Sequence, residues 1–443
     1  MSRRVVITGL GPVTGVGLGI EPTWQALLEG RSAVRPIEAF DASGFACQVA
    51  AEVDGLKISR FVPKTYRKAT KVMARDIEIA VAAADLAARD AALVTKGTVD
   101  PKAPDAEFSY QPSRVGVHIG AGLIAADLNE LTDALVEARN GQGEFDMHKW
   151  GAEGINHLTP LWLLKYLPNM LACHVTIIHD AQGPSNTITC AEASSGLSVG
   201  ESLRVIQRGA ADLCFCGGAE SKVNPMGFFR QHQTGWLTTT GNDEPERAVR
   251  PFDQTATGAV VGEGGGIVML EALDTYGQRS GDKKVYCEVV GFGASQSVNL
   301  DARNRAPEPT GRGIATAIEA ALREAMVEAG QIDLVVAFGS GHPRWDVAEV
   351  AALSRVFGAR LKDVPVVTTK QAVGTCNAGA GAIDIAIAAK AVYAQAAPPP
   401  ANRDNPIDGL GDAILSGPVR HALVYSTGIG GQNTSLVFKQ IDG

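Results

Sequence analysis

The 443-residue sequence carries little charge and has no long hydrophobic run. Only 20% of its residues are charged, and 48 acidic against 40 basic side chains leave a formal net charge of −8. Without a positive excess, we expect neither a nucleic acid nor an anionic membrane surface as a partner. The most apolar helical window, Leu161–Ile178, is interrupted by Lys165, Pro168 and His174. Because a membrane-spanning helix needs ~20 apolar residues, we also expect no membrane span.

Cysteine is scarce, and its spacing argues against a zinc site. The seven cysteines are scattered, and no two of them form a C-x-x-C motif. We therefore expect reduced thiols, with no metal and no other cofactor. The segment Cys214-Phe215-Cys216 is expected to alternate across a buried strand. The N-terminus has no continuous apolar segment of the kind found in a signal peptide, and this predicts a cytoplasmic protein.

Glycine is abundant, at 50 residues of 443, which indicates many tight turns and close backbone contacts. Short β-branched runs alternate with alanine-rich helical segments, and this alternation predicts an α/β fold. The predicted strands are Arg4–Thr8, Arg114–Ile119, Asn186–Cys190, Asp212–Cys216, Gly266–Glu271, Val285–Gly291, Leu334–Phe338, Val364–Thr368, His421–Ser426 and Thr434–Lys439. The predicted helices are Thr23–Glu29, Ala74–Ala91, Leu161–Cys173, Ser195–Arg208, Gly313–Ala329, Val347–Phe357 and Ala380–Ala394. Similar runs in both parts of the chain suggest two related halves that divide near residue 275.

Two glycine-containing turns are candidates for a functional site. Gly9-Leu10-Gly11 raises the possibility of a dinucleotide site, but Pro12 follows at once and no G-x-G-x-x-G motif is completed. The segment Gly183–Leu197 is more informative, because a β-branched strand passes into small residues and then into an amphipathic helix. This is the layout of a nucleophile elbow, and the residue that it presents is Glu192.

The same segment resembles the active-site stretch of the β-ketoacyl-acyl-carrier-protein synthases, or ketosynthases, which have the thiolase fold. Other segments share the resemblance along nearly the whole chain: Val5–Gly11, Leu167–Met170, Gly217–Glu220, Glu246–Asp253, Gly262–Gly264, Asp346–Glu349, Thr369–Lys370 and Gly428–Asn433. The resemblance implies a layered αβαβα architecture with two related halves. Residues 1–275 would form the N-terminal half, with the elbow at 186–200, and residues 276–443 the C-terminal half.

The resemblance also implies which residues occupy the catalytic positions. Ketosynthases use a cysteine thiolate to take the acyl chain and two histidines to stabilise the enolate of the malonyl donor. In this chain the cysteine position falls on Glu192, and the histidine positions fall on Phe338 and Thr375. A carboxylate is no durable acyl acceptor, because an acyl-glutamate is a hydrolysable anhydride. Cys190 lies two residues before Glu192, and we expect it to be packed inside a strand.

Six further positions follow from the resemblance. Lys370 and Glu349 match catalytic-site residues and are expected to brace the floor of the site through a buried ion pair or hydrogen-bond network. The substrate-binding positions are Ser340, His342, Trp345 and Ile429. Ser340 can donate to a pantetheine amide, Trp345 stands in place of a glycine and narrows the site, and Ile429 replaces the gating phenylalanine. His342 replaces a threonine, either as a partly exposed tunnel residue or as a relocated acid or base.

Three functions are compatible with these replacements. The first is a non-condensing partner that resembles the chain-length factors of polyketide synthases, which carry glutamine in place of the cysteine and shape an acyl pocket beside an active ketosynthase. The second is a decarboxylase or thioester hydrolase of the acyltransferase family that uses Glu192 and His342. The third is a non-catalytic homodimer that binds an acyl chain or its carrier.

The resemblance also implies which partners to expect. The resemblance implies an acyl carrier protein with its phosphopantetheine-linked chain, in fatty-acid or polyketide biosynthesis. It also implies at least a dimer, either a homodimer or a heterodimer with an active ketosynthase. The strand Asn186–Cys190 is expected to pair edge to edge in this dimer.

Overall fold

The computed structural model describes residues 3–100, 102–103, 106–279, 284–298 and 307–441. The strands are β1 (Val5–Thr14), β2 (Gly17–Leu18), β3 (Val34–Pro36), β4 (Val49–Ala51), β5 (Val115–Ala121), β6 (Ser185–Ile188), β7 (Leu213–Ser221), β8 (Glu263–Ala272), β9 (Cys287–Gln296), β10 (Leu334–Val336), β11 (Val366–Val367), β12 (His421–Thr427) and β13 (Gln432–Lys439). One mixed sheet has the order β11-β10-β12-β13-β9-β1-β8-β7-β5-β6, and β2 pairs with β1. The separate pair β3-β4 forms a second, small sheet.

The large sheet contains the same five-strand pattern twice. In the first half the order is β1-β8-β7-β5-β6, and in the second it is β9-β13-β12-β10-β11. If the five strands of each half are numbered along the chain, both halves have the spatial order 1-5-4-2-3. Within each half, four strands run in the same direction and one, β8 or β13, runs against them, so two of the four pairings are parallel and two are antiparallel. The halves join where β1 and β9 pair antiparallel, at Val6 with Glu288 and Ile7 with Cys287. The prediction of two related halves is therefore confirmed.

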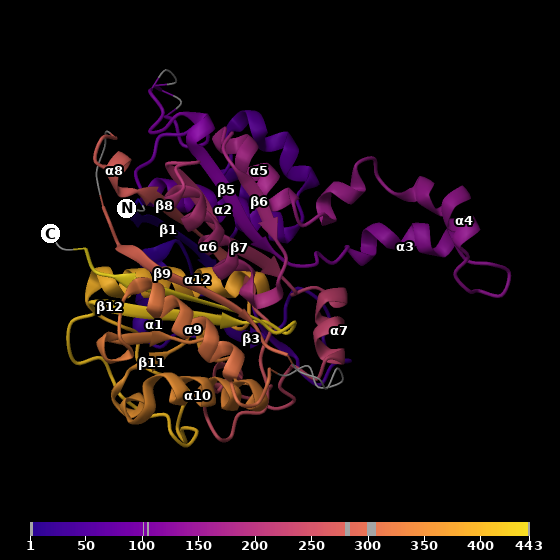
Figure 1. Ribbon diagram of the computed structural model, residues 1–443. Helices are drawn as coiled ribbons and strands as arrows, with labels where there is room; N and C mark the ends of the chain where they lie inside the picture. Colours follow the sequence, from indigo (N-terminus) through magenta and orange to yellow (C-terminus); the bar gives the residue numbers. More distant parts are fainter. Residues whose placement is uncertain (1–2, 101, 104–105, 280–283, 299–306, 442–443) are drawn as a thin grey trace.

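Helices form three layers around this sheet (Figure 1). The α-helices are α1 (Ile20–Leu28), α2 (Arg75–Asp90), α3 (Leu128–Glu137), α4 (Met147–Ala152), α5 (Met170–His179), α6 (Ser194–Gln207), α7 (Pro225–Gln233), α8 (Leu273–Tyr276), α9 (Arg312–Ala325), α10 (Pro343–Phe357), α11 (Lys370–Val373) and α12 (Ala380–Ala394). α6 and α12 pack against each other and against strands of both halves, so they form the middle layer. α2 and α5 cover the outer face of the first half, and α9 with α10 covers that of the second. The predicted αβαβα layering is confirmed.

An arm of residues 122–169 projects from the layered body (Figure 1). It carries α3, α4 and two 3-10 turns, Gly154–His157 and Trp162–Tyr166. The predicted helix Leu161–Cys173 is wrong, because the chain leaves the second turn before Pro168 and starts α5 only at Met170. In the part of the chain that the structure describes, no helix combines the length and apolarity needed to cross a bilayer.

The first strand continues beyond its predicted end at Thr8, through Gly9, Gly11 and Pro12 to Thr14. The glycines allow α2 to lie directly on this strand. A Cβ atom on Gly9 would lie 2.3 Å from the carbonyl oxygen of Ala87, and one on Gly11 would lie 2.1 Å from that of Ala83. These glycines therefore lie within the strand, where the absence of a side chain lets the helix approach closely, and they do not end it.

Candidate functional site

The predicted elbow joins β6 to α6 through a short 3-10 turn, η6 (Ala191–Ala193). Ala191 has a left-handed backbone with φ of 49°, which is unusual for a residue other than glycine. Ser194 holds the turn: its Oγ accepts from the Cys190 N–H at 2.8 Å and donates to the Ala191 carbonyl at 2.6 Å. Small side chains on both sides of Glu192 let the chain reverse this sharply, and Glu192 is the residue presented.

Glu192 is 5% exposed, and its carboxylate is held by backbone. The Ile429 N–H, 237 positions further along the chain, donates to Oε2 of Glu192 at 3.0 Å. Burial raises the pKa of Glu192 to about 7, although hydrogen bonds from backbone N–H groups oppose the shift. The side chain is therefore a buried acid that titrates near neutral pH. Ile429 itself is 37% exposed, so its contribution at this point is its peptide N–H.

A buried charge cluster that the sequence analysis did not single out lies near Glu192. The charge of Glu220 raises the pKa of Glu192 further, and that of Lys222 lowers it. Lys222 forms an ion pair with Glu220, whose other oxygen accepts from the Ala378 N–H at 2.8 Å. Asp76 completes the cluster, and burial raises its pKa to about 7. The signal was present in the sequence, since Glu220 and Lys222 interrupt an otherwise apolar strand and its end.

Phe338 and Trp345 fill the second part of the predicted site with aromatic side chains. Both are almost fully buried, at 0% and 1% exposure. Their ring centroids lie 6.0 Å apart, and Trp345 meets Trp236 edge to face at 5.0 Å. Trp236 also stacks on His342, with centroids 5.1 Å apart and planes 17° apart. Trp236 was not among the predicted residues, because it lies in a loop far from the others in the sequence.

His342 and Ser340 shape the start of α10. His342 is its N-cap, with Nδ1 accepting from the Arg344 N–H at 3.3 Å. Burial lowers the pKa of His342, so the ring is neutral at pH 7. Ser340 is fully buried, and its Oγ accepts from the His342 N–H at 3.2 Å. The two side chains thus take part in the turn itself. His342 is half-buried, as expected for the alternative in which it is a partly exposed residue.

Lys370 and Glu349 belong to two neighbouring buried networks. Lys370 forms an ion pair with Asp384, and Asp384 also accepts a hydrogen bond from Oγ1 of Thr369 at 2.7 Å. The Nζ atom of Lys370 lies 5.2 Å from the centroid of the Phe338 ring. Glu349 accepts from the Gly339 N–H at 2.9 Å and from the Tyr425 hydroxyl at 2.7 Å.

A second carboxylate secures the same loop. Asp346 accepts from the Phe252 N–H at 2.6 Å and from the Gly341 N–H at 3.2 Å. Burial raises the pKa of Asp346 and of Glu349, and the nearby charge of Asp346 raises that of Glu349 further. These two acids hold the loop between Phe338 and His342, where Gly339 has φ of 50°.

Thr375 lies on the Glu192 side of the site. Its backbone pairs with Val261, and the following 3-10 turn η10 (Asn377–Gly379) packs against η6. Thr375 is 2% exposed, and among the described residues its Oγ1 has no hydrogen-bond partner. A buried hydroxyl without a partner costs stability.

Cys190 is placed differently from the prediction. β6 ends at Ile188, so Cys190 lies outside the strand, directly before η6. It is half-buried rather than packed inside. The expected alternation of Cys214, Phe215 and Cys216 is confirmed, because the two cysteines face one core cluster and Phe215 faces another. Within the described residues, no group of three or more His, Cys, Asp or Glu side chains is placed to hold a metal ion.

Comparison with known proteins identifies the family. Residues 2–275 match the model of the β-ketoacyl synthase N-terminal domain, and residues 286–404 match that of the C-terminal domain. The chain belongs to the β-ketoacyl synthase family. It is 34% identical to 3-oxoacyl-[acyl-carrier-protein] synthase 2 of Vibrio cholerae, with 99% of each chain covered. It is 32% identical to the protein of the same name from Synechocystis, covering 99% of this chain and 98% of the relative.

Solved ketosynthase structures share the fold over the whole chain. The ishigamide ketosynthase/chain length factor is 27% identical with a TM-score of 0.80, and each chain is covered completely. A β-ketoacyl synthase from Burkholderia phymatum is 26% identical with the same TM-score, covering 99% of this chain and 100% of the other. The expected thiolase-like fold of the ketosynthases is therefore confirmed, and the family acts in fatty-acid and polyketide synthesis.

Proposed function

We propose that this ketosynthase family member does not condense acyl chains but pairs with an active ketosynthase and shapes its acyl pocket. The observation that carries the proposal is the Glu192 carboxylate at the elbow, held by the Ile429 N–H at 3.0 Å. A side chain that cannot keep an acyl group stands where the resemblance places the nucleophile. The backbone donor that would stabilise an oxyanion is engaged by this carboxylate instead.

The two other replaced positions support the same conclusion. Phe338 offers no hydrogen bond, and its ring packs against Trp345 and near the Lys370 ammonium. Thr375 carries a buried hydroxyl, which can donate one hydrogen bond but cannot act as an imidazole does at neutral pH. Without two imidazoles, the developing enolate of a malonyl donor has no strong donors at these positions.

We propose an acyl carrier protein as one partner, as the names of the relatives from Vibrio cholerae and Synechocystis indicate for those proteins. A basic segment of this chain, residues 57–71, supports the proposal. It contains no acidic residue, and its six cations are exposed: Lys57, Arg60, Lys64, Arg67, Lys68 and Lys71. The net charge of −8 conceals this local segment, because it counts the whole chain.

Two surfaces support a dimer. β6 is the terminal strand of the large sheet, and its first residues Ser185 and Asn186 are exposed, so its edge is free to pair with another strand. The arm of residues 122–169 adds a set of exposed apolar side chains: Leu123, Leu128, Leu135, Val136, Phe145, Met147, Ile155, Leu161 and Leu163. Such a concentration of exposed apolar side chains is typical of a protein interface. The ketosynthase/chain length factor neighbour makes an active ketosynthase our preferred partner.

An acylation assay tests the loss of the nucleophile. The chain is incubated with an acyl-loaded carrier protein and analysed by mass spectrometry of the intact protein and its peptides. We expect no adduct on the native chain, and an adduct on residue 192 in Glu192→Cys, because the elbow that presents this residue is formed. An acyl adduct on Cys190 of the native chain, or condensation product from the native chain alone, would overturn the proposal.

Co-expression tests the partner. A cysteine-containing ketosynthase encoded alongside the chain is produced with and without it, and complexes are separated by size. We expect a heterodimer, and a change in product chain length when Trp345 or Phe338 is substituted in this chain. A stable homodimer that does not bind the ketosynthase would contradict the proposed heterodimer. It would favour a homodimer that binds the carrier protein.

A second candidate function rests on one observation. The Glu192 carboxyl has its pKa raised to about 7, which suits a general base at neutral pH and hence a decarboxylase or thioester hydrolase. His342 is a weak helper in this scheme, because its ring is stacked on Trp236 and its Nδ1 accepts from backbone. Malonyl-thioester decarboxylation that Glu192→Gln abolishes would favour this function over the non-condensing partner.

A further inference from the structure

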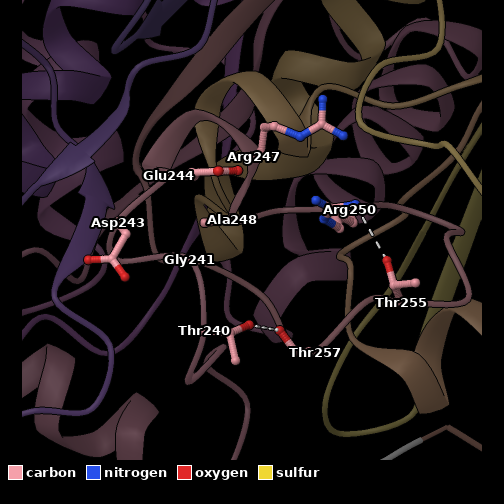
Figure 2. Close-up of a pocket in the computed structure, with 9 residues that line it drawn as sticks. All are labelled: Thr240, Gly241, Asp243, Glu244, Arg247, Ala248, Arg250, Thr255 and Thr257. Carbon is pink, nitrogen blue, oxygen red and sulfur yellow. Dashed lines mark hydrogen bonds between the residues drawn. The ribbon is translucent and has the colours of Figure 1, made fainter.

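A polar cavity of about 320 Å³ lies outside the elbow, in the loop region before β8. Nine residues line it: Thr240, Gly241, Asp243, Glu244, Arg247, Ala248, Arg250, Thr255 and Thr257. Figure 2 shows Arg247 and Arg250 on one side together with Thr255, and Asp243 on the other. The hollow is large enough for a small ligand group, and two arginines line it. The hydroxyls of Thr240 and Thr257 are hydrogen-bonded to each other at 2.8 Å.

Both arginines contact the same oxygen of a single carboxylate. Oδ2 of Asp404 pairs with Arg247 and lies 3.4 Å from Nη1 of Arg250. The only other contact recorded for the Arg250 guanidinium among the described residues is Oγ1 of Thr255, also at 3.4 Å. By contrast, Arg204 holds Glu324 through both terminal nitrogens at 2.6 and 2.5 Å. Asp404 is therefore held closely by Arg247 but only loosely by Arg250, and most donors of Arg250 remain available.

Asp404 is also easy to displace. Its side chain is 55% exposed, whereas that of Arg250 is 27% exposed. It lies in the loop between α12 and β12. An exposed carboxylate that bridges two arginines contributes little to stability, since water screens the pair. Asp404 thus acts as an internal anion that an external one can replace.

The cavity adjoins the loop that carries the predicted residues Ser340 and His342. A Cβ atom on Gly341 would lie 3.3 Å from the backbone nitrogen of Arg250 and 3.2 Å from the carbonyl oxygen of Gly258. The loop that carries Ser340 and His342 therefore packs on the segment that carries Arg250.

We propose that this cavity binds a phosphate ester between Arg247 and Arg250, and that Asp404 occupies the arginines until the phosphate displaces it. A phosphate presents several oxygens to both guanidinium forks, which one carboxylate oxygen cannot do. The Thr255 hydroxyl donates to Asp253 at 2.5 Å and accepts from Arg250 at 3.4 Å, so the guanidinium groups supply the donors. Asp243 and Glu244 also line the cavity and repel an anion, so the affinity depends on removing Asp404.

The phosphate has two possible sources, the arm of a carrier protein or a free coenzyme A thioester. The first source rests on the proposed function, whereas phosphate binding itself does not. We choose 4′-phosphopantetheine as the probe and pantetheine as its neutral counterpart, titrated by calorimetry at constant ionic strength. We expect at least tenfold tighter binding of the phosphorylated form to the native chain.

Three variants make the test specific. Arg247→Gln combined with Arg250→Gln is expected to remove the preference for the phosphorylated probe. Asp404→Asn is expected to tighten its binding several-fold, because the internal competitor loses its charge. Arg323→Gln, which changes an exposed arginine on α9, serves as the control and is expected to have no effect.

The outcomes separate the site from the proposed function. Equal binding of both probes, or an Asp404→Asn variant with unchanged affinity, overturns the phosphate site and leaves the acylation and co-expression tests untouched. Competition by holo-carrier protein but not by its apo form supports the site and identifies the carrier arm as the source. Competition by coenzyme A alone supports the site with a free thioester as the source.

Discussion

At the scale of single residues, Glu192 is a buried acid whose ionisation opposes folding. Its pKa is raised from 4.5 to about 7, first by burial and then by the charge of Glu220. The Ile429 N–H stabilises the ionised form but does not cancel the effect of burial. The buried, ionised Glu192 therefore lowers the stability of the folded chain near neutral pH. Such a local loss of stability is expected at functional positions.

Glu192→Gln is predicted to change the pH dependence of stability. Between pH 4.5 and 7 the folded chain binds more protons at Glu192 than the unfolded chain, so stability falls as the pH rises through this window. The variant lacks this loss, and its stability relative to the native chain should rise from pH 5 to pH 8. The relative gain is on the order of 2–3 kcal/mol, since one pKa unit corresponds to ~1.4 kcal/mol. Denaturant unfolding at both pH values measures it.

The control for this prediction is Glu319→Gln, which alters an exposed carboxylate on α9. Its stability relative to the native chain should be the same at both pH values. If Glu192→Gln behaves like this control, Glu192 is ionised without cost, and burial does not raise its pKa as described.

Thr375 and Thr369 form a matched pair for a second prediction. Both are buried, but Oγ1 of Thr369 donates to Asp384 at 2.7 Å, while that of Thr375 has no partner among the described residues. Thr375→Val should therefore raise the free energy of unfolding by about 1 kcal/mol, and Thr369→Val should lower it by about 1–3 kcal/mol. Equilibrium unfolding in urea measures both. A loss of stability in Thr375→Val would mean that its hydroxyl is satisfied.

The sequence predicted the position of Glu192 but not its environment. The pattern of strand, small residues and helix is local, so the elbow could be predicted from adjacent residues. The Ile429 N–H comes from the opposite half of the chain, and Trp236 joins Trp345 and His342 only through the tertiary fold. Contacts of this kind leave no local pattern, which is why they were found only in the structure.

At the scale of elements, the sequence predicted strands and helices better than their ends. α12 was predicted with its observed bounds, Ala380–Ala394, because its apolar run is continuous. β1 was predicted too short, because Gly9 and Gly11 were taken as turn residues. The arm helices α3 and α4 were not predicted, since their apolar side chains face solvent rather than a core of the same chain.

Gly11→Ala tests the close contact of β1 with α2. The added Cβ would lie 2.1 Å from the Ala83 carbonyl oxygen and 2.5 Å from the Ala87 nitrogen, and both are backbone atoms that cannot rotate away. Overpacking of this kind costs about 1–3 kcal/mol, so the melting temperature should fall clearly. Gly44→Ala is the control, because nothing lies within 4 Å of its added Cβ. Equal melting temperatures for the two variants would contradict the close contact.

At the scale of the whole molecule, the sequence pattern predicted the two halves but not the arm. The halves share one strand order, and their alternating pattern predicted the α/β class and the duplication. The arm breaks this symmetry, because no comparable projection is seen beside α9 or α10 in the described second half (Figure 1). Its exposed apolar side chains form the proposed interface with a neighbouring chain.

The arm therefore carries the prediction for assembly. Met147 and Ile155 are 69% and 50% exposed, and replacing both with lysine would place two charges in the proposed interface. Because truncating or charging a buried interface anchor costs about 2 kcal/mol or more, the dissociation constant of the dimer should rise at least 30-fold. Met326→Lys is the control, since Met326 is 91% exposed but lies at the end of α9 in the other half of the molecule. Sedimentation velocity over a range of micromolar concentrations measures the dimer dissociation constant of the double variant and of the control. A double variant that assembles as the native chain does would show that the arm is not the interface, and β6 alone would then remain as the surface for pairing. A native chain that sediments as a monomer with or without the ketosynthase would contradict both surfaces.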